Sequence, residues 1–147
     1  MKTLALRAAL VLFALMPGVS ANAADIGRIK VSSGPVHIER GGQRLAGAVD
    51  TPVLASDTLV TGANAQAGVT FADNTRAAIG QNSVLSINRY TYDPESHSGR
   101  FDATIQRGTL GVVSGRINKT TADAMTVRTP TMVMGVRGTE FVVEVPD

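Results

Sequence analysis

The residues of this sequence that could do chemistry are few, and the most unusual of them lie near its end. Arg137-Gly-Thr-Glu140 places a guanidinium and a carboxylate three residues apart between two apolar segments. A catalytic site would also need a nucleophile or a general base, and none stands beside them. We interpret Arg137 as a structural lock at a corner between two buried strands, where its fork can satisfy a carboxylate and backbone carbonyls together. A contact or ligand site is the alternative interpretation.

The two histidines form no pattern typical of catalysis or metal binding. His97 lies in a polar stretch with Asp93 and Glu95, and neighbours within one loop rarely converge on a single point. His37 stands alone between two apolar residues of a predicted strand, which places it on the outer face. The carboxylates are scattered singly and the chain contains no Cys. We therefore predict no catalytic residue, no cofactor and no metal site.

Residues 1–23 have the pattern of a Sec signal peptide. Two basic residues accompany an apolar run over residues 8–16, and Ala21 and Ala23 supply the small side chains that signal peptidase accepts. The run is too short to span a bilayer, which takes roughly 20 apolar residues. We predict cleavage after Ala23 and a periplasmic domain of residues 24–147 that has no stable membrane insertion.

The charge of the predicted mature chain is balanced. Two of the 14 basic residues, Lys2 and Arg7, belong to the signal peptide, so the 12 that remain equal the 12 acidic residues in number. A chain without surplus positive charge has no electrostatic drive toward polyanions. We predict no nucleic acid partner. The absence of Cys means that packing, without disulfides, must stabilise the exported domain.

Alternation of apolar and polar residues predicts an all-β fold. Apolar residues recur at every second position in short runs that Gly, Asn, Asp and Ser separate. These runs are Ile29/Val31, Val36/Ile38, Ala67/Val69/Phe71, Leu85/Ile87, Phe101/Ala103/Ile105, Leu110/Val112, Met125/Val127 and Phe141/Val143/Val145. We expect a single domain of many short strands, and the pattern leaves a sandwich, a roll and a short β-solenoid open.

Four segments depart from simple alternation. Residues 132–136 are apolar or small on both faces, which predicts a strand buried on both sides. Residues 93–99 and 114–123 are polar and predict exposed loops. Residues 49–57 are the only weak helix candidate, and Pro52 argues against it. We therefore expect no helix in the mature domain.

The order of these signals resembles one family, the FecR domain, a periplasmic signalling module. The resemblance spans residues 54–145 and rests on LASDTLVTGANAQAGVTFADNTRAAIGQNSVLSI, RGTLGVVSG and VRTPTMVMGVRGTEFVVEV. The residues that carry it most specifically, and that we take as its structural motif, are Arg128, Thr129, Pro130, Arg137, Gly138, Thr139, Glu140 and Phe141.

The middle of the resemblance is less specific residue by residue. Asp57, Gly62, Asp73 and Ser83 appear in the family's order. Where the family commonly has Asp-Gly after its central strand, this chain has Asp73-Asn74. Because Asn tolerates the left-handed conformation nearly as well as Gly, we expect the same turn.

The resemblance implies signalling in the envelope. Family members that regulate sigma factors carry a cytoplasmic helical domain, whereas only residues 1–7 precede the apolar run here, so we do not expect an anti-sigma role. We predict a non-catalytic, protein-binding or signalling module of the periplasm, with a membrane sensor or a transporter as its partner. A structural or carbohydrate-binding envelope module and a periplasmic hydrolase are the alternatives.

Overall fold

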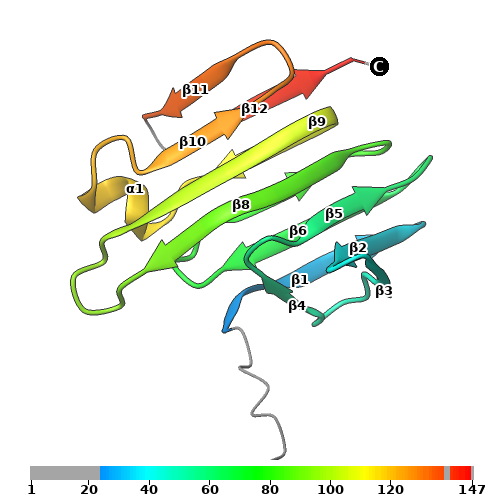
Figure 1. The fold of residues 1–147 in the computed structure, drawn as a ribbon, viewed down its shortest axis with the longest axis horizontal. Helices are drawn as coiled ribbons and strands as arrows, with labels where there is room; N and C mark the ends of the chain where they lie inside the picture. The colour runs from blue at the N-terminus through cyan, green and yellow to red at the C-terminus, as the bar shows by residue number, and fades with distance from the viewer. Residues whose placement is uncertain (1–23, 138–139, 147) are drawn as a thin grey trace, which may run out of the picture.

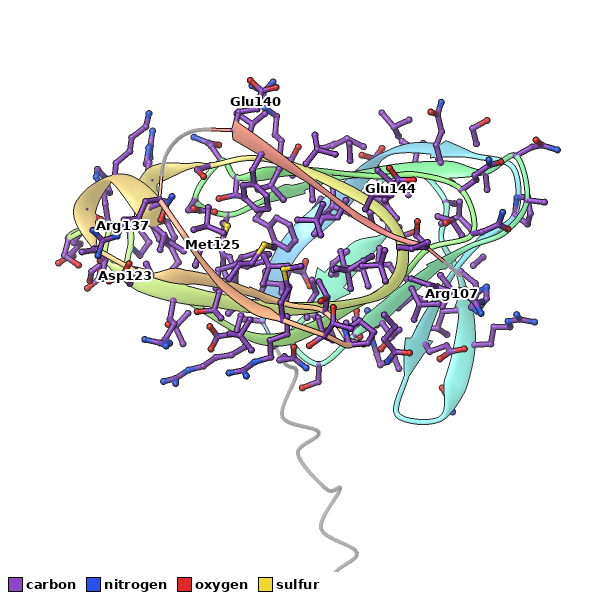
Figure 2. The ribbon with its side chains drawn as sticks, turned by 90° about the horizontal axis from the view of Figure 1, so that it is seen from above. Arg107, Asp123, Met125, Arg137, Glu140 and Glu144 are labelled. Carbon is purple, nitrogen blue, oxygen red and sulfur yellow. The ribbon has the colours of Figure 1, made fainter. Side chains whose placement is uncertain are left out.

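The computed structural model describes residues 24–137 and 140–146, and they form an all-β fold. Twelve strands join into one sheet, which curls so that its two halves face each other as layers. Figure 1 shows the strands of the sheet, and Figure 2, turned by 90°, shows side chains filling the space between the layers. The predicted fold class is confirmed. The predicted signal peptide lies outside the described residues.

Six strands make up the first layer. In spatial order they are β4 (Pro52–Leu54), β1 (Asp25–Ser33), β6 (Gln66–Phe71), β7 (Arg76–Ile79), the second half of β9 (Gly99–Val113) and β12 (Glu140–Val145). The second layer contains β3 (Gln43–Ala46), β2 (Val36–Arg40), β5 (Thr58–Thr61), β8 (Val84–Tyr92), the first half of β9, β10 (Met125–Arg128) and β11 (Val133–Val136). Strand β9 belongs to both layers and connects them.

Gly108 marks the point where β9 passes from one layer to the other. Its φ is +94°, a conformation that residues with a Cβ rarely adopt. A Cβ at this position would also collide with the side chain of Ser83. The Ser83 hydroxyl accepts a hydrogen bond from the backbone N–H of Thr109 at 3.0 Å. Gly108 is therefore required at this position, where β9 bends close to Ser83, the residue that precedes β8.

The pairing of the strands identifies the architecture as a roll. Every pair is antiparallel except β9 with β10, which run parallel over residues 101–104 and 125–128. A β-solenoid stacks successive coils through parallel pairing. A sandwich has two separate sheets, whereas β9 joins both layers of this fold into one sheet. Of the architectures that the sequence left open, the roll is the one observed.

The core lies between the layers and follows the predicted alternation closely. Val69 and Phe71 of the first layer and Ile105 and Phe101 of the second are all buried in the same core. The Phe101 and Phe71 rings pack edge to face with their centroids 4.8 Å apart. The centroid of the Tyr90 ring lies 5.5 Å from each of theirs. These aromatic rings tie the two layers together at one end of the core.

The Ile29/Val31 pair is an exception to the alternation. Ile29 is fully buried, whereas Val31 is 50% exposed. A β-bulge between them inserts Lys30, so Ile29 pairs with Val69 and Val31 pairs with Gly68 on the opposite face. One extra residue inverts the side-chain direction, because strand side chains alternate with a period of two.

Three sequence predictions about local structure need correction. The segment 114–123 is not only a loop, because helix α1 (Arg116–Thr120) lies in it with Ile117 fully buried. The expectation of no mature helix is therefore wrong. Strand β11 is not buried on both faces, since Val133 is 61% exposed and β11 pairs only with β10. The segment 93–99 is a mostly exposed turn and 49–57 is not helical, as predicted.

Candidate functional site

The residues of the predicted motif gather around strands β10, β11 and the start of β12. Arg128 ends β10, where its side chain is exposed. Thr129 shapes the turn to β11, because its hydroxyl accepts hydrogen bonds from the backbone N–H of Thr131 at 3.3 Å and of Met132 at 3.1 Å. Pro130 lies exposed in the same turn. The Arg-Thr-Pro part of the motif therefore builds the β10–β11 hairpin.

Arg137 forms an ion pair with a carboxylate, as the sequence suggested, but the pair is exposed to solvent. Its Nε donates to Oδ1 of Asp123 at 2.9 Å, and its Nη2 donates to Oδ2 at 3.0 Å. The two side chains are 78% and 57% exposed, so the expected position beside the core is wrong. Figure 2 shows the pair at the end of the molecule where α1 lies. The Arg137 guanidinium lowers the pKa of the Asp123 carboxyl through this hydrogen-bonded contact.

The remainder of the motif leads from the second layer into the first. Gly138 and Thr139 lie outside the described residues. Glu140 begins β12 with its side chain exposed, and Phe141 is half-buried and packs against the core. In Figure 2 Glu140 lies on the outer side of its layer. The motif thus connects β11, an edge of one layer, to β12, an edge of the other.

Strand β11 is the least protected of the four sheet edges. The edge strand β4 begins with Pro52, β3 carries Arg44, and β12 carries Glu140 and Glu144. Proline and charged residues are the means by which native proteins discourage an edge from pairing with another chain. Strand β11 has the sequence Val-Met-Gly-Val and contains neither.

Exposed apolar side chains reinforce the open character of this edge. Met132, just before β11, and Val133, its first residue, are 52% and 61% exposed. An unpaired strand edge offers backbone N–H and C=O groups to an extended peptide. The sequence does not reveal this edge, because the same Met and Val residues also fit a fully buried strand. Only the position of β11 in the sheet distinguishes the two.

The less specific motif residues form buried polar corners. Asp57 is 1% exposed. Its carboxylate accepts hydrogen bonds from Nε and Nη2 of Arg40 at 2.8 and 2.7 Å. The backbone N–H of Leu54 donates to the same carboxylate at 2.8 Å. Its hydrogen bond with Asp57 raises the pKa of Arg40. This pair is the lock that the sequence suggested for Arg137. The sequence does not single out Arg40, because no local pattern links it to a residue 17 positions away.

Asp73 organises a second buried corner. Its carboxylate accepts the Thr75 hydroxyl at 2.6 Å, the Tyr90 hydroxyl at 2.9 Å and the backbone N–H of Ile117 at 3.3 Å. Burial, followed by the nearby Asp73 carboxylate, raises the pKa of the Tyr90 hydroxyl, so this group stays protonated and donates. Asn74 adopts the predicted left-handed conformation with φ +69°. These contacts hold α1 against the turn between β6 and β7.

Chemistry-bearing groups elsewhere in the described part of the chain do not converge. Within residues 24–137 and 140–146, no three His, Asp or Glu side chains are arranged to hold a metal ion. His37 lies 3.4 Å from Glu39, and His97 lies in its turn beside Tyr92. No helix in the same residues is long and apolar enough to cross a membrane.

Comparisons with known proteins returned one finding. The family model described as FecR protein matches residues 57–147. The match includes Asp57 and Asp73 of the buried corners as well as the β10–β12 motif. No curated protein and no solved structure matches the chain.

Proposed function

Because this chain belongs to the FecR family, we propose that it is a non-catalytic protein-recognition module of the periplasm that relays a signal to a membrane protein. The family is associated with envelope signalling, which supports the general role. The partner is a periplasmic segment of a membrane sensor or a transporter. The signal peptide over residues 1–23 delivers the domain to that compartment.

The unprotected edge of β11 is the observation that carries this proposal. An extended segment of the partner adds to β11 as a further strand, and backbone hydrogen bonds along the edge supply affinity. Val133 is exposed beside this edge, whereas Met134 packs partly against the core. Residues at alternate positions of the incoming strand would therefore meet an apolar surface on one side and water on the other.

The Asp123–Arg137 pair gives the edge a polar end. Both side chains are exposed, so a carboxylate of the partner can compete with Asp123 for the guanidinium fork without a large desolvation cost. The preferred segment is extended, carries β-branched residues and ends in an acidic residue placed near Arg137. This chemistry distinguishes the partner from a sugar polymer or a hydrolysable substrate.

Photocrosslinking in intact cells tests the proposal. A photoreactive phenylalanine replaces Met132, and we expect adducts to one membrane protein. Val133→Lys, which places an edge-protecting charge on β11, should abolish these adducts while the domain stays folded. The matched control introduces Lys at Val49, which is 52% exposed and distant in sequence from β11, and should leave the adducts unchanged.

The opposite outcomes identify the alternatives. Adducts that persist in the Val133→Lys variant would exclude β11 as the binding edge. Sedimentation of the purified domain with cell wall, without adducts, would favour the structural or carbohydrate-binding role. Hydrolysis of an envelope substrate by the purified domain would favour the enzyme.

A further inference from the structure

The outer face of the first layer contains an apolar trough. One row of side chains crosses five strands in register, from Val31 on β1 through Gly68 on β6, Ala78 on β7 and Gly111 on β9 to Val142 on β12. The three central residues are small, whereas the valines at the two ends project into solvent. The resulting concavity has a volume of about 540 Å³. We call the small residues the floor and the two valines the walls.

Packing requires a small residue at Gly68, where a Cβ would lie 3.2 Å from the Cβ of Val31, but it does not require one at Gly111. A Cβ built on Gly111 would lie 3.8 Å from Val142 and 3.9 Å from Ala78, which are ordinary contacts. A larger, strand-favouring residue would therefore fit there. The wall on β1 exists only because the bulge at Lys30 turns Val31 outward. The sequence thus places small residues in the middle of the sheet face and larger, outward-facing valines at its two sides.

The trough exposes apolar surface that a solitary domain would be expected to cover. Val31 and Val142 are 50% and 69% exposed. A second concavity of about 400 Å³ continues along the strands toward Gln66, Gly80 and Thr109 over the same floor. Continuous apolar surface of this kind on a soluble protein marks a site where another molecule docks.

Charged side chains border the trough in a defined arrangement. Arg76 lies at one end of the floor, in register with Val113 and Glu140. Glu140 and Glu144 lie along the β12 wall, on the outer side of that strand. Lys30 also lines the trough, but its Nζ pairs with Oδ1 of Asp50 at 3.6 Å. Among the described residues, Arg76, Glu140 and Glu144 take part in no ion pair of the domain. A docked molecule can therefore complement one positive and two negative charges at known places.

We propose that the trough binds an amphipathic α-helix of a protein partner, lying along the strands between the two walls. Four strand spacings of about 4.8 Å separate the β1 and β12 backbones, or roughly 19 Å. A helix with its side chains is about 10–12 Å across and fits that width.

The hydrogen-bonding needs of the partner's backbone favour a helix over an extended peptide on this face. All three floor strands, β6, β7 and β9, already pair on both sides, so the face offers no backbone partners. An extended peptide pressed onto it would bury N–H and C=O groups without hydrogen bonds. A helix satisfies these groups internally. Strand-like partners suit the β11 edge, whereas helical partners suit this face.

The borders define the chemistry of the helix. Its apolar stripe carries leucine-sized residues that fill the space above Gly68 and Gly111. Lysine or arginine residues lie on the flank that faces Glu140 and Glu144, and a carboxylate lies at the end above Arg76. The trough and β11 lie in different layers, so the two surfaces can be occupied independently and tested separately.

Photocrosslinking from the two walls tests the proposal in cells that export the full chain. Photoreactive residues at Val31 and, separately, at Val142 should label the same partner segment, which mass spectrometry then locates. We expect an amphipathic helical segment with a basic flank. A segment of β character, a second copy of this chain, or no adducts from either wall would overturn the proposal. Adducts from Met132 are scored separately, so failure here leaves the β11 proposal standing.

A synthetic peptide of the labelled segment then provides a binding assay with the mature domain. Its helical circular dichroism should increase on binding. Gly111→Thr, which fills the floor, should raise Kd by about tenfold or more, because a buried leucine contact is lost. Ala78→Thr serves as a second filling variant if Gly111→Thr folds poorly. Ala46→Thr, at an exposed position of β3 in the other layer, is the matched control and should leave Kd unchanged. An unaltered Kd in both filling variants contradicts the proposal.

Discussion

The molecule contains the same arginine–aspartate fork twice, once at the edge of its core and once in solvent. In the Arg40–Asp57 pair the carboxylate is almost fully buried and also accepts the Leu54 N–H. In the Arg137–Asp123 pair both partners are mostly exposed, although the two N–O distances are similar. Hydrogen-bond geometry alone therefore does not reveal what a pair contributes. The dielectric surroundings and the other hydrogen bonds of the carboxylate decide it.

The wider regions differ in the same way. The corners between strands β4 to β8 place Asp57, Asp73 and Ser83 in the interior, each with several hydrogen bonds. The β10–β12 region places its motif residues at edges and turns. We infer that the first region holds the roll together and the second presents surface to a partner.

Removal of the Asp73 carboxylate should produce the largest effect. Asp73→Ala leaves the Thr75 and Tyr90 hydroxyls and the Ile117 N–H buried without their acceptor, which should cost about 3–5 kcal/mol of unfolding free energy. Urea denaturation of the purified domain measures it. Asp93→Ala is the control, because Asp93 accepts the Glu95 N–H in an exposed turn and should have little effect. Equal losses of unfolding free energy in the two variants would contradict the stabilising role of the buried Asp73 corner.

The two forks can be compared directly by alanine substitution. Arg40→Ala strands a buried carboxylate and should cost about 2–3 kcal/mol, somewhat reduced because water reaches part of the site. Arg137→Ala should leave the melting temperature unchanged within error. Arg40→Lys should restore little, since one ammonium cannot replace both donors of the fork. A large loss for Arg137→Ala would restore its interpretation as a structural lock.

Two tyrosines differ in whether their buried hydroxyl groups form hydrogen bonds. Tyr90→Phe keeps the ring contacts with Phe71 and Phe101 but removes the hydrogen bonds to Asp73, so we expect a loss of about 1–2 kcal/mol. Tyr92→Phe should be neutral or stabilising, because within the described residues the buried Tyr92 hydroxyl has no hydrogen-bond partner. The order of the two unfolding free energies is the result to check.

The smallest expected effect concerns the pH dependence of the exposed fork. Arg137 lowers the pKa of Asp123. A carboxyl whose pKa is lowered in the folded state contributes its stabilisation above its unfolded pKa and loses it as pH falls through the folded value. The pair should therefore be intact at neutral pH and separate only in acid, with almost no change in global stability.

A carbon NMR titration of the Asp123 carboxyl checks this prediction. Its midpoint should rise toward the ordinary aspartate value in the Arg137→Gln variant. The midpoint of Asp93 should not move, because backbone N–H groups, that of Glu95 first, lower the pKa of Asp93. An unchanged Asp123 midpoint would mean that the fork is not formed in solution.

Much of the fold could be predicted from the sequence because strand burial is periodic. The alternation at Phe101/Ala103/Ile105 and at Ala67/Val69/Phe71 placed every one of these side chains in the core. The Asp73-Asn74 turn was predicted from the tolerance of Asn for positive φ. Both inferences depend on neighbours in the chain, where sequence carries the information.

The sequence determined which residues alternate, where the chain turns and which motif it carries. Long-range contacts set which strands became edges, which arginine met a buried carboxylate and which side of β1 Val31 faces. Those outcomes depend on pairings between residues distant in sequence, such as Arg40 with Asp57 and Val31 with Gly68. A Val-Met-Gly-Val segment is equally compatible with a central and an edge strand. Its exposure in β11 follows from having a neighbour on one side alone, a property that no local pattern encodes.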